Sequence, residues 1–235
     1  MNAKNLKLLY EGKAKKIFEF TENEVIIFFK DDVTAFNGLK KDSLSGKGKI
    51  NKKISKFFFD MLEKENIPTH FIKDIDENSF LAKKGKIIPL EVIVRNYTAG
   101  SFCKRYGLKK GIKFKNPILE YSLKNDELGD PMICKNIILS LNLIENNLLE
   151  KIENYSLKIN NIISNFLLEK NLILVDYKLE FGINNNEIFL ADEISPDTCR
   201  FWDKNTMESF DKDIYRENKG NLIDKYKEFL RRINL

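Results

Sequence analysis

Hydrophobic and polar positions in the N-terminal part of the chain alternate with the two-residue period of β-strands. The stretches are short, rich in β-branched and aromatic residues, and separated by turn-forming residues. They predict strands at residues 6–12, 15–21, 24–31, 69–75 and 79–84. One longer segment instead repeats its apolar residues at helical spacing. It spans residues 48–66 and carries Ile50, Ile54, Phe57, Phe58, Met61 and Leu62 on one stripe.

The remainder of the chain mixes helical and strand patterns. Gly85 and Pro89 predict a hinge at residues 84–89. A loop-rich stretch is expected to end near residue 135. The other predicted elements are a strand at 90–96, a short helix from Ser101, a long helix at 145–170, a hairpin of strands 172–182 and 187–195, and a helix at 220–233. This order predicts an α+β protein with lobes at 1–84 and 85–235 and a ligand cleft between them.

The first hairpin strand combines an apolar face with a charged one. Side chains alternate faces along a strand, so Asp176, Lys178 and Glu180 share one face. Val175, Tyr177, Leu179 and Phe181 are expected on the other, against the core. If the turn is centred near Asn186, Glu180 faces Asp192 across the strands, and like charges placed opposite each other are destabilising. The pair either holds a cation such as magnesium together with substrate phosphates, or lies on a solvated face.

Two other segments have features of anion sites. In EGKAKKIF, Gly12 permits close backbone approach, and Lys13 and Lys15 point to the same side. They are suited to phosphate oxygens, although a pair of surface lysines is the plainer interpretation. In RNYTAGSFCKR, Arg95 ends an apolar strand and Ser101 is a plausible helix N-cap. An arginine beside free helical N–H groups suits a phosphate monoester, and an ordinary capped helix is the alternative.

The segment ISPDTCRFWDK follows the second hairpin strand. Its Pro196–Asp197 turn brings Asp197 and Arg200 out of the sheet near the carboxylate pair. Arg200 is then either a second anion clamp or a packed surface arginine.

Composition narrows the chemistry. The 235 residues include His70 as the only histidine and three scattered cysteines, which argues against a zinc site, a Ser-His-Asp triad or a disulfide framework. His70 is expected to be structural. A net charge of +5 fits a nucleotide ligand as well as a nucleic acid. The sequence has no signal peptide pattern and no apolar run long enough for a membrane span, so we expect a cytoplasmic protein.

Taken together, the motifs resemble those of one family. They are EGKAKKIF, TAFNG followed by GKGxxN, PxEVIVRNxxAGSxxKR, KNDxxxDP, VDYKLEFG and ADEISPDTxRxWDK. In order and spacing, from about residue 8 to the C-terminus, the chain is similar to the phosphoribosylaminoimidazole-succinocarboxamide (SAICAR) synthase family. The resemblance implies a two-lobed fold with an antiparallel, kinase-like lobe that covers ATP and a C-terminal lobe related to ATP-grasp enzymes. It also implies a homodimer.

The implied activity is an ATP-dependent ligation. The family joins L-aspartate to the carboxylate of carboxyaminoimidazole ribonucleotide (CAIR) and releases ADP and phosphate. A carboxylate is a poor acyl donor, so ATP must activate it, most simply as an acyl phosphate. Positioning and charge neutralisation by lysines and magnesium then carry most of the catalysis, and no nucleophilic side chain is needed.

The resemblance also assigns site residues by position. The nucleotide site comprises Gly12, Lys13, Ala14, Lys15, Ile17, Ile26, Ala82, Lys83, Ile87 and Lys124, and magnesium is assigned to Glu180 and Asp192. The ribonucleotide phosphate is assigned to Arg95, Ser101 and Arg200. The rest of the substrate site comprises Glu91, Asp176, Lys178, Asp197, Asp213 and Arg216. Direct catalytic roles are expected for Lys13, Lys124, Lys178 and Asp192.

Two rival functions make different predictions. A small-molecule kinase with the same ATP cleft would release ADP at full rate without aspartate. A basic RNA-binding protein would lose affinity steeply with salt and expose aromatic residues among basic ones. The aromatic residues here lie mostly at core spacing, which argues against RNA binding.

Overall fold

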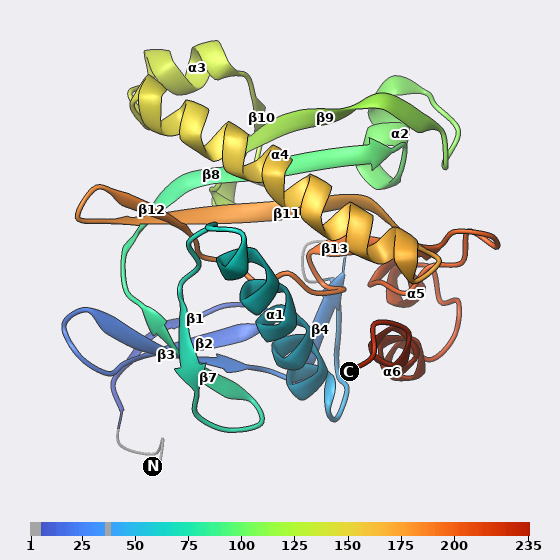
Figure 1. Cartoon of the computed structure of the whole chain (residues 1–235), viewed down its shortest axis with the longest axis horizontal. Helices are drawn as coiled ribbons and strands as arrows, with labels where there is room; N and C mark the ends of the chain where they lie inside the picture. The colour runs from blue at the N-terminus through green and yellow to red at the C-terminus, as the bar shows by residue number, and fades with distance from the viewer. Residues whose placement is uncertain (1–5, 36–38) are drawn as a thin grey trace.

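The computed structural model describes residues 6–35 and 39–235, and its first sheet lies in the N-terminal part of the chain (Figure 1). This sheet has five antiparallel strands in the order β1-β2-β3-β7-β6. Their bounds are Leu8–Glu11, Lys15–Glu19, Glu24–Phe29, Ser79–Lys83 and Phe71–Asp74. A separate hairpin pairs β4 (Asp32–Ala35) with β5 (Lys40–Ser43). Three residues of the TAFNG motif, 36–38, lie outside the described residues.

The second sheet forms the floor of the site. It runs β10-β9-β8-β11-β12, and β13 also pairs with β11. The bounds, in that order with β13 last, are Met132–Ile133, Lys113–Leu123, Lys86–Tyr97, Leu172–Asn184, Glu187–Leu190 and Cys199–Asp203. All of these pairings are antiparallel. The α+β class is therefore confirmed.

The longer helices are α1 (Lys47–Lys64), α4 (Asn146–Glu169) and α6 (Leu222–Arg232). Helix α4 crosses the second sheet, and Figure 1 shows it running over β8 and β11. The shorter helices are α2 (Gly100–Tyr106), η2 (Asp126–Leu128), α3 (Lys135–Ser140) and α5 (Asp213–Arg216). Across the described residues, no helix combines the length and the apolar character required to cross a bilayer.

The hydrophobic core is continuous from one sheet to the other. Phe58 of α1 is fully buried and contacts Phe166 of α4 and Phe201 of β13 through its ring. The main cluster also includes residues of β3 and α6. The first sheet ends at Lys83 and the second begins at Lys86, so the change of sheet lies near the proposed lobe boundary. The division into independent lobes stays a prediction.

Two segments expected to be irregular are strands. Residues 86–89, expected in the hinge, belong to β8, and the loop-rich region contains the long strand β9. Pro89 is tolerated because it falls at an irregularity of the ladder, where Glu91 pairs with Glu180 but Ile87 already pairs with Gly182. Proline lacks the N–H that a regular ladder position needs, and it is therefore found at such bulges.

The hairpin register differs by one residue from the expected one. Asn185 and Asn186 both have positive φ (48° and 64°) and form the two-residue turn between β11 and β12. Glu180 is therefore opposite Ala191, and the N–H of Ala191 donates to the carbonyl of Glu180 at 2.9 Å. Strand β12 also ends at Leu190, so the direct Glu180–Asp192 pairing predicted from the sequence is wrong.

A bulge changes the expected faces of β11. Its pairing with β13 shifts between Leu174 and Asp176. Val175 consequently belongs to a small cluster with Trp202, separate from the main core that contains Tyr177. An extra residue in one strand locally disturbs the alternation. The expectation that Val175 shares the face of Tyr177 is wrong, whereas the remaining alternation holds.

Candidate active site

Charged side chains of two neighbouring strands, β8 and β11, lie on one face of the second sheet. In β8 and β11, Arg95 is opposite Asp176 and Glu91 is opposite Glu180. Residues directly opposite in a ladder point to the same side, so these groups share a face. The other face packs against α4, where the Tyr177 hydroxyl donates to the carbonyl of Ser156 at 2.7 Å. The period of two in the sequence thus separates a core face from a polar face.

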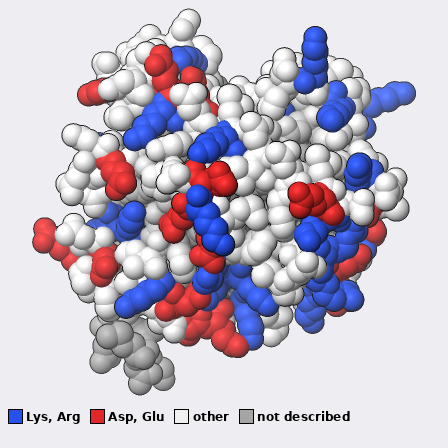
Figure 2. Space-filling model, viewed as in Figure 1, with Lys and Arg blue, Asp and Glu red and all other residues white. Residues whose placement is uncertain are grey.

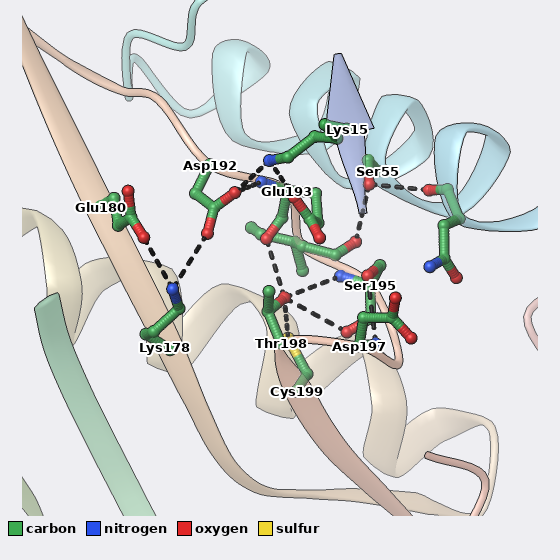
Figure 3. A network of polar contacts seen from close by, with 12 residues as sticks. Lys15, Ser55, Lys178, Glu180, Asp192, Glu193, Ser195, Asp197, Thr198 and Cys199 are labelled. Carbon is green, nitrogen blue, oxygen red and sulfur yellow. Dashed lines mark hydrogen bonds and ion pairs between the residues drawn. The ribbon is translucent and has the colours of Figure 1, made fainter. Parts of the chain in front are cut away.

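Lys178 lies at the centre of a lysine–carboxylate cluster. Its Nζ is 2.8 Å from Glu91, 2.6 Å from Glu180 and 3.4 Å from Asp192. Figure 3 shows the amine between the last two carboxylates. Lys124 approaches the same Glu180 oxygen as Lys178, at 3.0 Å. Burial opposes the charge of Lys178, but the carboxylates outweigh it and hold its pKa well above the usual value.

Lys15 reaches this cluster from the other sheet. It is on β2, and its amine ion-pairs with Asp192 and Glu193 (Figure 3). Burial and the neighbouring Asp192 raise the pKa of Glu193 to about 7, while Lys15 and Lys178 hold the pKa of Asp192 well below normal against its burial. Glu193 was not predicted as a site residue. Its position inside the ADEISPDT motif was the available signal.

The turn before β2 meets the KND segment. The Gly12 amide donates to the carbonyl of Lys15 at 2.9 Å, which closes the turn around Lys13 and Ala14. Lys13 is exposed and its amine is 2.9 Å from Asp126 of η2. The structure therefore brings the glycine turn of the first sheet to the segment that carries Lys124.

The residues assigned to the adenine slot do not all share one surface. Ile26 pairs with Phe18 rather than with Ile17, so Ile17 and Ile26 lie on opposite faces of the first sheet. Ala82 is fully buried, whereas Ile87 is 41% exposed. A single adenine slot cannot use the side chains of both Ile17 and Ile26, because the strand register puts them on opposite faces of the sheet.

His70 is buried in the core, where it packs against Phe59 of α1 and Phe80 of β7. Its ring packs edge-on against Phe59, with centroids 5.2 Å apart, and the ring is almost completely buried. Its carbonyl accepts the amide of Lys83 at 2.7 Å, so that N–H is not free to contact a base. Burial and the nearby Lys15 lower the His70 pKa to about 3. The structural role expected for His70 agrees with these contacts.

An arginine–carboxylate chain lies further along the same polar face. Asp176 is shared by two arginines: its Oδ2 is 2.7 Å from Arg95 Nη1, and its Oδ1 is 3.0 Å from Arg200 Nη1. Arg200 Nε is 2.7 Å from Asp213, whose other oxygen is 2.6 Å from Arg216. Burial raises the pKa of Asp213, but the two arginines more than offset it and lower the value to about 2.

The start of α2 is built around Arg200. Gly100 has φ of +51°, and a Cβ there would lie 2.4 Å from Arg200 Nη2. Only glycine allows the guanidinium to pack so closely on the backbone in this conformation. The helix begins at Gly100, Ala99 is its N-cap, and no side chain caps it. Ser101 is therefore inside the helix and exposed, and its predicted N-cap role is wrong.

Asp197 is not brought to the arginine chain. Its carboxylate ion-pairs with the fully buried Lys47 and accepts the Tyr226 hydroxyl at 2.8 Å. Burial disfavours its charge, but Lys47 and Lys212 hold its pKa below the usual value. These contacts link the GKG segment, the ISPDT turn and α6, so the observed role of Asp197 is to join three elements of the fold.

The carboxylates are consistent with a magnesium ion that is held mainly by phosphates. Among the described residues, no three His, Cys, Asp or Glu side chains are grouped as a metal site. Glu180 and Asp192 nevertheless both contact one amine, and a cation already lies between them. Magnesium is commonly bound by one or two carboxylates together with substrate phosphates. The donor set is suited to that arrangement.

The charged side chains on one face of the molecule do not gather into a single basic area. On the face seen in Figure 2, basic and acidic side chains are interspersed. The site thus gathers lysines and arginines on one polar face, an arrangement suited to an enzyme that acts on phosphorylated anions, and the described cluster contains no activated nucleophile.

Comparisons with known proteins identify the family. A family model described as SAICAR synthetase matches residues 8–233. A phosphoribosylaminoimidazole-succinocarboxamide synthase of Caldanaerobacter subterraneus subsp. tengcongensis is 55% identical over 227 residues, covering 96% of this chain and 97% of the relative. The chain belongs to the SAICAR synthetase family.

Two solved structures extend the comparison to bound ligands. A SAICAR synthetase in complex with ADP is 49% identical, with a TM-score of 0.93 and coverage of 95% of this chain and 96% of that one. A SAICAR synthase from Saccharomyces cerevisiae complexed with SAICAR is 25% identical, with a TM-score of 0.81 and coverage of 99% and 94%. The fold predicted from the family resemblance is confirmed.

Proposed function

We propose that this chain ligates L-aspartate to the carboxylate of CAIR, with conversion of ATP to ADP and phosphate, as a step of purine biosynthesis. It is an ATP-dependent, amide-forming ligase by family membership. The observation that carries the proposal is the single polar face on which the lysine–carboxylate cluster adjoins the arginine chain. Relatives bound to ADP and to SAICAR support it.

The nucleotide phosphates are assigned to three lysines. Lys13 projects from the glycine turn, Lys15 reaches in from β2 and Lys124 from the KND segment. Lys15 and Lys124 are paired with carboxylates of the cluster, whereas the exposed Lys13 is paired with Asp126 in the segment that carries Lys124. Lysine amines exchange such partners for phosphate oxygens readily because they are flexible point charges. The base is assigned to Ile17, Ala82 and Ile87, and to groups of Lys83 other than its N–H, which His70 already engages, while Ile26 lies on the opposite face.

Magnesium is assigned to Glu180 and Asp192. When bound, the ion neutralises phosphate charge and polarises the transferred group. Lys178 keeps the carboxylates together and neutralises them in the absence of the ion. Glu91, which also contacts Lys178, is assigned to the carboxylate end of CAIR.

The ribonucleotide phosphate is assigned to Arg95, Arg200 and Ser101 at the start of α2. Within the described residues, Arg95 uses Nε and Nη1 for protein carboxylates, and no hydrogen bond or ion pair engages its Nη2, which we assign to the phosphate. Asp176 fixes both guanidiniums, so the clamp is assembled before the ligand arrives. Asp213 and Arg216 continue this network, and we assign them to the imidazole, ribose or aspartate pocket.

The reaction proceeds in two balanced displacements. A carboxylate oxygen of CAIR bonds to the γ-phosphorus as the bond to ADP breaks. The neutral amine of aspartate then bonds to the acyl carbon as the bond from that carbon to the phosphate oxygen breaks, and the proton lost by the nitrogen passes to the leaving phosphate or to water. The positive charges of the lysines stabilise the negative charge that develops on the phosphoryl oxygens during these displacements, which is the electrostatic contribution expected for phosphoryl transfer.

A coupled assay of ADP release tests the proposal. ADP release should require ATP, magnesium, CAIR and L-aspartate together, and the product should be SAICAR. Full-rate ADP release without aspartate would contradict the ligase and favour a kinase. Light scattering and fractionation test the accompanying proposals of a homodimer and a cytoplasmic location.

A further inference from the structure

The arginine chain continues past Arg95 to a residue with no assigned role. Glu120 of β9 is opposite Ile93 and lies on the polar face of the sheet. Its Oε2 is 2.5 Å from Arg95 Nε, and its Oε1 is 2.6 Å from Nη2 of Arg105 on α2. Only 10% of its side chain is exposed. One carboxylate thus connects β8, β9 and α2.

The geometry of Arg95 depends on this carboxylate. Asp176 engages Arg95 at Nη1, and Glu120 engages it at Nε. Two acceptors on different edges of a planar guanidinium determine its orientation, whereas one acceptor leaves it free to rotate. The remaining nitrogen, Nη2, is then directed by the protein rather than by the ligand.

Arg105 belongs to the same arrangement. Its Nη1 is 3.5 Å from Ser101 Oγ, a residue assigned to the phosphate. Its guanidinium and that of Arg95 both lie near the Phe102 ring, at 5.8 and 5.5 Å from the centroid. Two arginines this close repel each other unless an anion lies between them, and Glu120 provides that anion.

We propose that Glu120 is the positioning residue of the phosphate clamp, and that Arg105 is its third arginine. Glu120 holds Arg95 in the orientation that presents Nη2 to the ribonucleotide phosphate, and it holds Arg105 beside Ser101. This inference rests on the proposed function, because it concerns the CAIR phosphate.

Glu120→Gln tests the positioning role. An amide keeps the shape but can no longer accept from both guanidiniums with full charge. The KM for CAIR should rise about tenfold or more, the scale of a weakened charge-assisted hydrogen bond, while the KM values for ATP and aspartate stay within about twofold. A purely structural role would instead lower the melting temperature and change all three KM values together, and that result would overturn the proposal.

Glu153→Gln is the matched control. Glu153 of α4 is also ion-paired, to Lys135, and accepts the Tyr121 hydroxyl on the opposite face of the sheet. Its variant should leave the KM for CAIR unchanged. An equal rise in both glutamine variants would overturn a specific role for Glu120.

Arg105→Gln keeps the proposal testable if the Glu120 variant does not fold. Arg105 is partly exposed, with 31% of its side chain accessible, so its removal is tolerated by the core. The KM for CAIR should again rise selectively, and an unchanged value would overturn the third-arginine role. Loss of the proposed function itself is distinguishable, because the unmodified enzyme would then release no ADP in response to aspartate and CAIR.

Discussion

Gly100 gives the sharpest test of how the phosphate clamp is assembled. In Gly100→Ala the new Cβ would lie 2.4 Å from Nη2 and 2.8 Å from Cζ of Arg200. Ordinary contact begins near 3.4 Å, so the guanidinium must move by about 1 Å. Its hydrogen bonds to Asp213 (2.7 Å) and Asp176 (3.0 Å) then exceed normal lengths. The residue also keeps a positive φ, which costs alanine about 1–2 kcal/mol.

The expected kinetic effect follows from one misplaced arginine. A hydrogen bond to a charged group contributes about 1.5–3 kcal/mol, which corresponds to about a 10- to 150-fold rise in the KM for CAIR. The KM for ATP should change by less than about twofold, since the lysine cluster does not contact Arg200. Initial rates at varied CAIR and saturating ATP and aspartate measure the first value.

Gly107→Ala separates backbone strain from the clash. Gly107 ends the same helix with φ of +64°, and a Cβ added there would meet no atom within 4 Å. This variant carries a similar strain but leaves Arg200 in place. Its melting temperature should fall while its KM for CAIR stays unchanged. Equal KM values in the two alanine variants would refute the reasoning.

Three further predictions concern other parts of the site. Asp192→Asn removes one carboxylate from Lys15 and Lys178, and magnesium-dependent ADP release should fall about 100-fold with the circular dichroism spectrum retained; near-normal turnover would contradict the metal assignment. Arg95→Ala should raise the KM for CAIR far more than that for ATP, and equal changes would contradict the clamp. The folded-state pKa of His70 is about 3 and its ordinary value is 6.5, so the unfolded chain takes up a proton first as the pH falls, and stability declines below pH 6.5. Between pH 6 and pH 5, the free energy of unfolding measured in urea should therefore fall by about 1 kcal/mol less for His70→Phe than for the unmodified protein. An equal fall in both proteins would show that His70 does not contribute to the pH dependence of stability.

Local patterns in the sequence predicted much of the fold. The helical stripe at residues 48–66 and the long helix at 145–170 agree with α1 and α4 within a few residues. The predictions that differ from the structure do so for local reasons. Pro89 has the sequence pattern of a hinge, because its position at a ladder irregularity depends on the partner strand. The hairpin register failed by one residue because both Asn185 and Asn186 take positive φ, which shifts the centre of the turn.

The sequence motifs predicted some residues of the candidate site but not others. Motifs resembling one family pointed to Lys15, Lys178, Glu180 and Asp192, and the structure brings these side chains together. No sequence motif points to Glu120, because its segment has a loop-like pattern although it forms strand β9 in the structure.

What the sequence determined by itself is the division of faces within each element. Alternation alone puts Asp176, Lys178 and Glu180 on one side of β11, since the strand period depends only on neighbouring residues. Tertiary structure decided which groups those side chains meet. Lys15 reaches Asp192 across 177 positions of the chain, and Arg200 reaches the backbone of Gly100. Such contacts depend on strand register, bulges and the packing of one sheet against another, and none of these is encoded by a local period.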